Sequence, residues 1–365
     1  MSSPVRIGVV GAGEIAQTTH LPYLYELNDL FELVALAEPS ATVRDRLQRR
    51  YQLEAAYEDH RALLEHPGLD AIAVCSPNAT HADVALGALH AGLHVFVEKP
   101  LCITLADADR LIAARDRAGK VAQVGYMNRY DTSFERMRDD LPSSPDEVRA
   151  INVLTYDPKL GRFFNRYDTV RARDVGEAVI AATRAAEAVQ VEEAVGATDP
   201  EGRFVFSEIF LGTLVHDVNV VHGLLEQMGE PLPARVLDGG WWAGGLAVTG
   251  TVELANRARW TTTFAELPEA HDFLQTITVL FPDSIRSLAF PAPYLRQTPS
   301  TYERSLEQDG VRVVTRTGSF HECYARELER FHDAIVNGAS CATPLEQARL
   351  DIEVLTEMFL RACDR

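Results

Sequence analysis

The stretch VRIGVVGAGEIA, residues 5–16, constrains the fold of this chain more than any other feature. Its first six residues are almost all apolar, as in a parallel strand that is covered on both faces. Gly11, Gly13 and Ala16 follow with the spacing G-x-G-x-x-A. In that motif the first glycine permits a tight turn, the second leaves room for a pyrophosphate, and the third small residue lets helix and strand pack closely. The stretch predicts a dinucleotide-binding βαβ unit. The alternative is an empty unit that uses its glycines for packing alone.

A second apolar stretch, residues 31–39, contains Glu38 near its end, 25 positions after Gly13. A carboxylate at this place accepts hydrogen bonds from both ribose hydroxyls and repels a 2′-phosphate. Glu38 therefore favours NAD over NADP. Glu14 and Ile15, which follow the second glycine at the start of the helix, are expected to contact the same cofactor.

Strands and helices keep alternating up to residue 127. Strands are expected at 71–77, 94–100 and 122–127, and helices at about 40–51, 58–65, 80–92 and 104–118. This alternation predicts a doubly wound parallel sheet, in which ligands bind beyond the carboxyl ends of the strands. The residues expected on that rim, together with Gly11, are Ser76, Pro77, Asn78, Glu98, Lys99 and Tyr126.

The stretch VFVEKPLC, residues 95–102, places two charges and a proline directly after a core strand. A solvated strand end is the simplest explanation for such a charged pair. The position of Lys99 on the ligand rim of a parallel sheet favours a functional role instead.

The character of the chain changes after Asn128. Two long helices are expected at 174–195 and 205–225, followed by strands rich in valine, threonine and aromatic residues. Hairpin-spaced strands after a βα half predict an α+β domain with a large, mostly antiparallel open sheet. The predicted fold class is α/β, with a Rossmann domain at 1–127 and an α+β domain at 128–365. The terminal helices, from about 319 to 365, are candidates to pack back on the first domain.

The composition limits the partners of the protein. The chain has 365 residues and a formal net charge of −18, and its pI is near 5.0. An acidic surface repels nucleic acid and anionic lipid, so neither is an expected partner. The five cysteines are scattered without a CxxC pair, which argues against a disulfide framework and a zinc site. Because the sequence shows no signal peptide and no apolar run of about 18 residues, we expect a cytoplasmic protein. Because it shows no cluster of metal ligands, we expect no bound metal.

Several motifs together resemble the glucose–fructose oxidoreductase and inositol dehydrogenase (GFO/IDH/MocA) family. They are GAGEIA, the SPNATH turn that includes His81, HVFVEKPLC, VGYMNRYD, HDVN and the terminal stretch from 327 to 355. The resemblance implies oxidation of a sugar, cyclitol or related polyol hydroxyl, or reduction of the matching ketone, with NAD or NADP. It implies dimers or tetramers built through the open sheet. It also places Lys99 beside the nicotinamide and the substrate as acid/base, with Glu98 to orient it and Pro100 often preceded by a cis bond.

The second motif of that family, D-x-x-x-H on a helix, is incomplete in this sequence. His216 is present as the second expected catalytic and substrate-binding residue, but Gly212 stands where the aspartate is usual. His216 can act with Lys99 alone, Asp217 or Asn219 can take over part of the role, or Glu208 can reach in from two turns earlier. Loss of redox chemistry is the remaining explanation.

Further residues have both a functional and a structural interpretation. Tyr126 and Arg129 follow the last Rossmann strand and would flank the substrate, although either can be structural. A histidine among apolar neighbours is often a core residue, which is the alternative for His216 and the expectation for His222. The tryptophans of GGWWAGG, residues 239–245, suit a strand interface better than a sugar platform, and the helix at 174–195 suits packing better than a lid.

Three functions are compatible with the sequence. The first is an NAD-dependent dehydrogenase or reductase acting on CH–OH groups. The second retains and recycles NAD while it eliminates or cleaves a glycoside. The third is an inactive NAD-binding sensor or scaffold, with Gly212 as the mark of lost catalysis. The substrate, the direction of the reaction and the role of residues 160–204 do not follow from the sequence.

Overall fold

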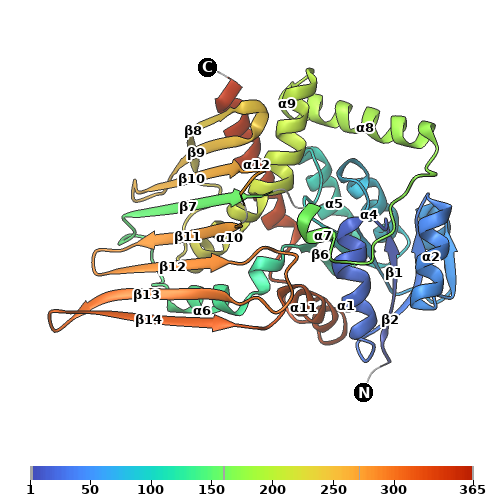
Figure 1. The fold of residues 1–365 in the computed structure, drawn as a ribbon, viewed down its shortest axis with the longest axis horizontal. Helices are drawn as coiled ribbons and strands as arrows, with labels where there is room; N and C mark the ends of the chain where they lie inside the picture. The colour runs from blue at the N-terminus through green and yellow to red at the C-terminus, as the bar shows by residue number, and fades with distance from the viewer. Residues whose placement is uncertain (1–2, 159–160, 271, 364–365) are drawn as a thin grey trace. The chain divides into compact units, whose positions relative to one another are not determined.

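The chain forms two compact units in the computed structural model, which describes residues 3–158, 161–270 and 272–363 (Figure 1). Unit 1 comprises residues up to 126, together with 163–194 and 324–349. Unit 2 comprises 127–162, 195–323 and the residues from 350 onward. The sequence-based division at 127 does not include the segment 163–194, whereas the segment 324–349 lies within the terminal helices that were expected to pack back on the first domain.

Unit 1 is built on a six-stranded sheet, sheet A, with the order β3-β2-β1-β4-β5-β6, in which all the pairs are parallel. The strands are β1 (Val5–Val10), β2 (Phe31–Ala37), β3 (Ala55–Tyr57), β4 (Ala71–Val74), β5 (His94–Glu98) and β6 (Ala122–Gly125). The strand order reverses between β1 and β4, so the expected ligand position lies at the carboxyl ends of these two strands. The doubly wound Rossmann sheet is confirmed. Sequence analysis missed only the short strand β3.

Helices connect the parallel strands, and their ends follow from local capping. Ser40 accepts a hydrogen bond from the Val43 N–H at the start of α2, and Thr104 accepts one from the Asp107 N–H at the start of α5. The helical elements of this unit are η1 (Ala16–His20), α1 (Leu21–Glu26), α2 (Ala41–Tyr51), α3 (His60–Leu64), η2 (Asn78–Thr80), α4 (His81–His90), α5 (Leu105–Ala118), α8 (Glu177–Val195) and α11 (Cys323–Asn337). The end residues Val195 and Cys323 of the last two belong to unit 2.

Unit 2 contains an eight-stranded sheet, sheet B, with the order β14-β13-β12-β11-β7-β10-β9-β8. Its pairs are antiparallel except for β7 with β10, so the predicted large and mostly antiparallel sheet is confirmed. The strands are β7 (Ala150–Asp157), β8 (Arg235–Trp242), β9 (Ala247–Glu253), β10 (Arg259–Glu266), β11 (Leu274–Leu280), β12 (Ser284–Phe290), β13 (Ser300–Gln308) and β14 (Val311–Ser319). Sequence analysis missed β13, whose charged residues hide its alternation.

One face of this sheet is covered by helices. Burial alternates along β9, β11 and β12, as expected when one face packs and the other does not. Gly239 in β8 is required by this packing, because a Cβ there would lie 1.9 Å from the Met358 carbonyl oxygen. The helical elements of the unit are η3 (Met127–Tyr130), α6 (Thr132–Asp140), α9 (Pro200–Phe204), η4 (Val205–Leu214), α10 (Val215–Gln227) and η5 (Ala243–Gly245). Two helices are divided between the units, α7 (Gly161–Phe164) and α12 (Leu345–Cys363).

The helix expected at 205–225 differs from the prediction in its geometry. A continuous helical segment runs from 200 to 227, and its part η4 is a π-helix rather than an α-helix. Within the described chain, this segment alone is long and apolar enough to cross a membrane by composition. However, 72% of its most apolar window is buried inside the protein, as in the core helix of a globular unit.

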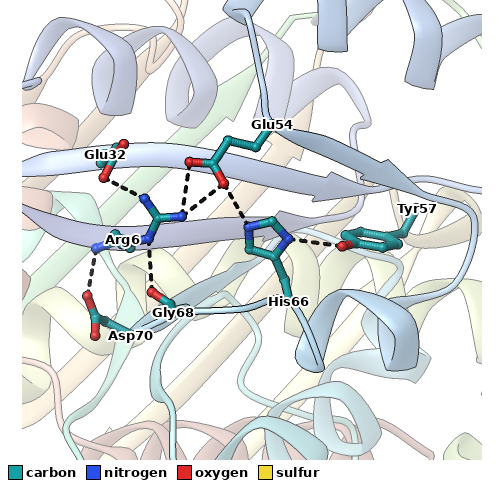
Figure 2. A network of polar contacts seen from close by, with 7 residues as sticks. All are labelled: Arg6, Glu32, Glu54, Tyr57, His66, Gly68 and Asp70. Carbon is teal, nitrogen blue, oxygen red and sulfur yellow. Dashed lines mark hydrogen bonds and ion pairs between the residues drawn. The ribbon is translucent and has the colours of Figure 1, made fainter.

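The amino-terminal edge of the parallel sheet is held by a network around Arg6 (Figure 2). The guanidinium donates to Glu32 at 2.8 Å, to both carboxyl oxygens of Glu54 at 3.0 Å, and to the Gly68 carbonyl at 3.0 Å. His66 extends the network, since its ring lies 3.3 Å from Glu54 and 2.9 Å from the Tyr57 hydroxyl. These charges are paired with one another and tie together the starts of neighbouring strands.

Candidate active site

The glycine turn after β1 meets two different requirements. Gly11 has a φ of +86°, and a Cβ at this position would lie 2.6 Å from the Ser76 backbone. Gly11 is therefore needed for the turn and for the close approach of the strand ends. A Cβ on Gly13 would meet no described atom within 4 Å. Because packing does not explain this second glycine, the open space beside Gly13 fits the approach of a pyrophosphate to the backbone.

Glu38 lies directly after β2 and faces the glycine turn. One carboxyl oxygen accepts the Ala12 N–H at 3.0 Å, and the other accepts the Ser40 N–H at 2.9 Å. The side chain is buried, so these two backbone groups fix its direction. A carboxylate oxygen can accept more than one hydrogen bond, which leaves acceptor capacity for ribose hydroxyls at the predicted place.

The SPNATH turn follows β4 and is joined to the end of β5 through His81. One ring nitrogen of His81 lies 2.7 Å from the Pro100 carbonyl oxygen and the other lies 2.8 Å from the Ser76 carbonyl oxygen. Burial lowers the pKa of His81, which favours the neutral ring, and a neutral ring donates one of these two bonds at a time. His81 thus fixes the position of the turn relative to Pro100. Ser76 and Asn78 are half-buried and Pro77 is exposed.

Glu98 ends β5 inside the unit and is oriented from two sides. Its Oε1 lies 2.6 Å from His20 Nε2, and its Oε2 accepts the Lys99 N–H at 3.0 Å. The peptide bond between Lys99 and Pro100 is cis, as the resemblance implies. Lys99 is half-buried and leaves the strand at the same carboxyl edge as Gly11 and Glu38. The charged pair of the sequence is thus a buried, anchored carboxylate followed by a lysine at the rim.

A second buried acid lies close to Glu98. Glu327 of α11 is fully buried, and within the described chain neither of its carboxyl oxygens has a hydrogen-bond partner. Burial and the nearby charge of Glu98 raise the pKa of Glu327 well above its ordinary value. A neutral Glu327 beside an anchored Glu98 concentrates the negative charge of this region on Glu98.

His20 is the contact of this site that sequence analysis missed. It belongs to η1, a π-helical turn that starts at Ala16 of the glycine motif, and it is fully buried. Short π-helical segments are frequent at functional sites. The histidine four positions after the motif was visible in the sequence, but nothing in the spacing connected it with Glu98, 78 residues further on.

The residues expected from the second half of the chain belong to unit 2. His216 is half-buried in the first turn of α10, directly after the π-helix η4 that contains Gly212. A Cβ on Gly212 would approach no described atom closer than 3.4 Å, so there is room for a Cβ at this position. The assumed α-helical relation between positions 212 and 216 is wrong, because η4 has π-helical geometry.

Two proposed substitutes for the missing aspartate have structural contacts. Asp217 accepts hydrogen bonds from Thr155 at 2.9 and 3.0 Å and from Gln275 at 2.7 Å. Burial raises the pKa of Asp217 to about 6. Asn219 donates to Asp351 at 2.7 Å. Both side chains are buried, Asp217 in contacts with the strands β7 and β11 and Asn219 in a contact with α12, while Glu208 is exposed.

His222 lies fully buried, with its ring nitrogen 2.6 Å from Asp351, which agrees with the structural role expected for it. Arg129 is also buried in unit 2, against Gly223 of α10, where a Cβ would lie 2.4 Å from the guanidinium carbon. The guanidinium donates to the Asn219 carbonyl at 3.2 Å, and burial lowers its pKa. Tyr126, the last residue of the first segment of unit 1, is buried.

Two other expectations concern aromatic residues and a helix. Trp241 stacks on Phe359 within unit 2, with ring centroids 6.5 Å apart, while Trp242 is 52% exposed. The helix expected at 174–195 begins at 177 as α8, and its described side chains are mostly exposed, with Val191 fully buried. Gln190 near its carboxyl end donates to the Ala79 carbonyl at 2.9 Å, and the expected packing role of this helix stays a prediction.

The geometry of unit 1 defines a class of protein. A parallel sheet with a glycine turn, a carboxylate after β2 and a lysine after β5 is a dinucleotide-binding Rossmann unit. Among the described residues no group of three histidine, cysteine or acidic side chains could hold a metal ion.

Comparison with known families identifies this unit more closely. Residues 5–126 match the GFO/IDH/MocA model, described as "Oxidoreductase family, NAD-binding Rossmann fold". This match confirms, over residues 5–126, the resemblance drawn from the motifs of the sequence.

Individual relatives agree with the assignment. The chain is 34% identical to myo-inositol 2-dehydrogenase of Thermotoga maritima over 155 residues, which cover 42% of this chain and 46% of the relative. It is 33% identical to D-glucoside 3-dehydrogenase of Escherichia coli over 140 residues, which cover 38% and 40%. The chain thus spans less than half the length of these curated relatives.

Similarity to solved structures extends over nearly the whole chain. A 3-ketoreductase from Actinomadura kijaniata, solved with NADP and TDP-benzene, superimposes with a TM-score of 0.71 at 18% identity, covering 96% of each chain. This comparison shows the fold alone. The family supports a bound nicotinamide dinucleotide without deciding between NAD and NADP.

Proposed function

We propose that this protein is an NAD-dependent oxidoreductase that acts on a secondary alcohol, or the matching ketone, of a sugar, cyclitol or related polyol. The observation that carries the proposal is the shared edge of sheet A, where open space beside Gly13, the oriented Glu38 and the rim lysine Lys99 all follow strand ends. Bound there, the nicotinamide supplies or accepts the hydride. The named activities of the inositol and glucoside dehydrogenases support the substrate class.

Lys99 is proposed as the acid/base of the reaction. Alcohol oxidation requires removal of the hydroxyl proton, and ketone reduction requires a proton donor to the carbonyl oxygen. Glu98 cannot swing away to compete for that role, because His20 and the Lys99 N–H fix both of its oxygens. Lys99 is therefore the ionisable group of this motif that lies at the rim. His216 and Arg129 stay predictions as assisting and substrate-binding residues.

NAD is proposed over NADP because Glu38 lies where the adenosine ribose binds in Rossmann units. Its carboxylate accepts the ribose hydroxyls, whereas a 2′-phosphate at the same place would meet a negative charge. The residues proposed to line the remainder of the cofactor site are Gly11, Gly13, Glu14, Ile15, Ser76, Pro77, Asn78, His81, Glu98 and Lys99.

The function is tested by following absorbance at 340 nm with NAD and a panel of sugars, inositols, sugar acids and glycosides. We expect NADH to form with one substrate class. Parallel wells follow glycoside cleavage, because cleavage without NADH would instead identify the recycling enzyme. If neither assay gives a signal while NAD binding is confirmed, the result would favour an inactive NAD-binding sensor over an enzyme.

The open face of sheet B is proposed to join copies of the chain into a dimer or tetramer. Leu154 and Ile285 are 39% and 46% exposed on the strands β7 and β12. A monomer in sedimentation at all concentrations would contradict this proposal. A cytoplasmic location is proposed with it, and fractionation of cells tests that location.

A further inference from the structure

A segment of unit 1 distant in sequence lies against the predicted ribose end of the cofactor site. This segment, residues 168–174, is here called the strap and leads into α8 (Figure 1). Val170 exchanges two hydrogen bonds with Gln17, at 2.7 and 2.9 Å, and Gln17 also donates to the Ala12 carbonyl at 2.7 Å. The strap is thereby attached to the helix that follows the glycine turn.

The other end of the strap is attached to the start of α2. Asp174 accepts hydrogen bonds from the Ser40 hydroxyl, and from the N–H and the hydroxyl of Thr42, both at 2.9 Å. These contacts hold the pKa of Asp174 well below its ordinary value, so the carboxylate stays ionised. The amino end of a helix of 11 residues is thus already filled by an anion from the same chain.

Ser40 connects the Asp174 carboxylate with that of Glu38, which is proposed to bind the ribose. Its N–H donates to Glu38, and its hydroxyl donates to Asp174. The two carboxylates are therefore neighbours on either side of one residue. Glu38 accepts only backbone N–H groups in these contacts, whereas Asp174 takes the side-chain donors that follow β2.

A 2′-phosphate on the ribose held by Glu38 would need positive charge or donors at this same place. The Ser40 hydroxyl, the Thr42 N–H and the Thr42 hydroxyl are suitable donors, and each is bound to Asp174. The phosphate would have to displace one carboxylate while it approaches a second. We propose that Asp174 is a specificity-determining residue, which excludes NADP by occupying the anion-binding start of α2.

This inference rests on the proposed function, because it requires that NAD binds with its ribose at Glu38. With Asp174 in place, the preference for NAD over NADP would not depend on Glu38 alone. With Asp174 removed, three donors at a helix start become free beside the ribose, in the same helix as Arg44 and Arg46.

The test is a fluorescence titration of the full chain with NADH and with NADPH. The variants are Asp174→Asn, which removes the charge at constant size, and Asp174→Ala. The matched control is Asp168→Asn, because Asp168 lies in the same strap but pairs with Arg46, at 2.9 Å, and with Arg50, at 3.6 Å, along α2 rather than with its start. We expect both Asp174 variants to bind NADPH about tenfold more tightly or better, with NADH affinity changed less than about threefold.

The other outcomes overturn the inference in distinguishable ways. An equal change for NADH and NADPH would make Asp174 a tether of the strap without a role in specificity. The same NADPH gain in Asp168→Asn would assign the effect to net charge. If the wild-type chain binds NADH and the Asp174 variants keep its preference, only this inference fails. If the wild-type chain binds neither nucleotide, the proposed function fails with it.

Discussion

The two edges of sheet A carry similar side chains and use them differently. At the amino edge, Arg6 is surrounded by acidic groups that it pairs with directly, and His66 and Tyr57 complete the network (Figure 2). At the carboxyl edge, Glu38 is held by backbone N–H groups and Glu98 by His20, while space remains beside Gly13. Charges that neutralise one another form a structural edge. Carboxylates fixed by backbone N–H groups and a histidine, next to unfilled space, form an edge prepared for a ligand.

The largest predicted effect is the loss of turnover when the lysine at the carboxyl edge is replaced, compared with replacement of a lysine at the amino edge. Lys99→Met should lower kcat by roughly 10²- to 10⁴-fold, since it removes the acid/base, and should leave NAD affinity nearly unchanged. Lys120, just before β6 at the amino edge, is the matched control, and Lys120→Met should keep full activity. Steady-state kinetics and NADH titration measure the two quantities. Unchanged turnover in Lys99→Met would remove this lysine from the mechanism.

A second comparison is between the two glycines of the turn. Gly11→Ala should cost about 2 kcal/mol of folding stability or more, because the alanine would need a positive φ and would clash with the backbone of Ser76. Gly13→Ala should keep the melting temperature, since its methyl group has room, but weaken NAD binding by about tenfold because it obstructs the pyrophosphate. Thermal melts and titrations of both variants test this. Undiminished NAD affinity in Gly13→Ala would indicate that the open space has another use.

The acids near the two edges predict opposite dependences of stability on pH. Arg6 lowers the pKa of Glu54, so the stability contributed by this pair is present above the unfolded pKa and is lost as the pH falls through the folded pKa. Burial raises the pKa of Glu327, so the native state binds the extra proton and stability falls as the pH rises above about 4.5.

Glu327→Gln should remove the fall in stability that rising pH causes through Glu327. The wild-type chain should lose up to about 1.4 kcal/mol of unfolding free energy per pH unit relative to the variant, until Glu327 is ionised. Urea unfolding from pH 5 to pH 8 measures the difference, with Glu329→Gln, at an exposed position of α11, as the control. A constant difference across this range would mean that the pKa of Glu327 is not raised.

Much of this fold follows from local pattern in the sequence. The apolar strands, the alternation of strands with helices and the glycine turn predicted the Rossmann unit to within a few residues. β3 was missed because three residues, Ala-Ala-Tyr, form no detectable pattern. The π-helix η4 was missed because apolar periodicity over 205–214 does not separate π from α geometry.

The site was predicted where motifs bring residues close in sequence, and was missed where the fold brings distant ones together. Glu38 and Lys99 follow strand ends, so a parallel sheet places them on one edge. His20 and Asp174 act across 78 and 134 residues respectively, and no spacing in the sequence relates them to Glu98 and Ser40. Such contacts depend on the path of the whole chain.

The most direct test of the difference between the edges is a calorimetric titration of NAD into the wild-type chain, Glu38→Ala and Arg6→Met. We expect Glu38→Ala to weaken NAD by about 10- to 100-fold through the loss of charged hydrogen bonds, and to narrow its advantage over NADP. Arg6→Met should lose about 1–2 kcal/mol of stability and bind NAD like the wild-type chain. Equal weakening of NAD binding in both variants, or in neither, would contradict the assignment of the carboxyl edge as the cofactor site.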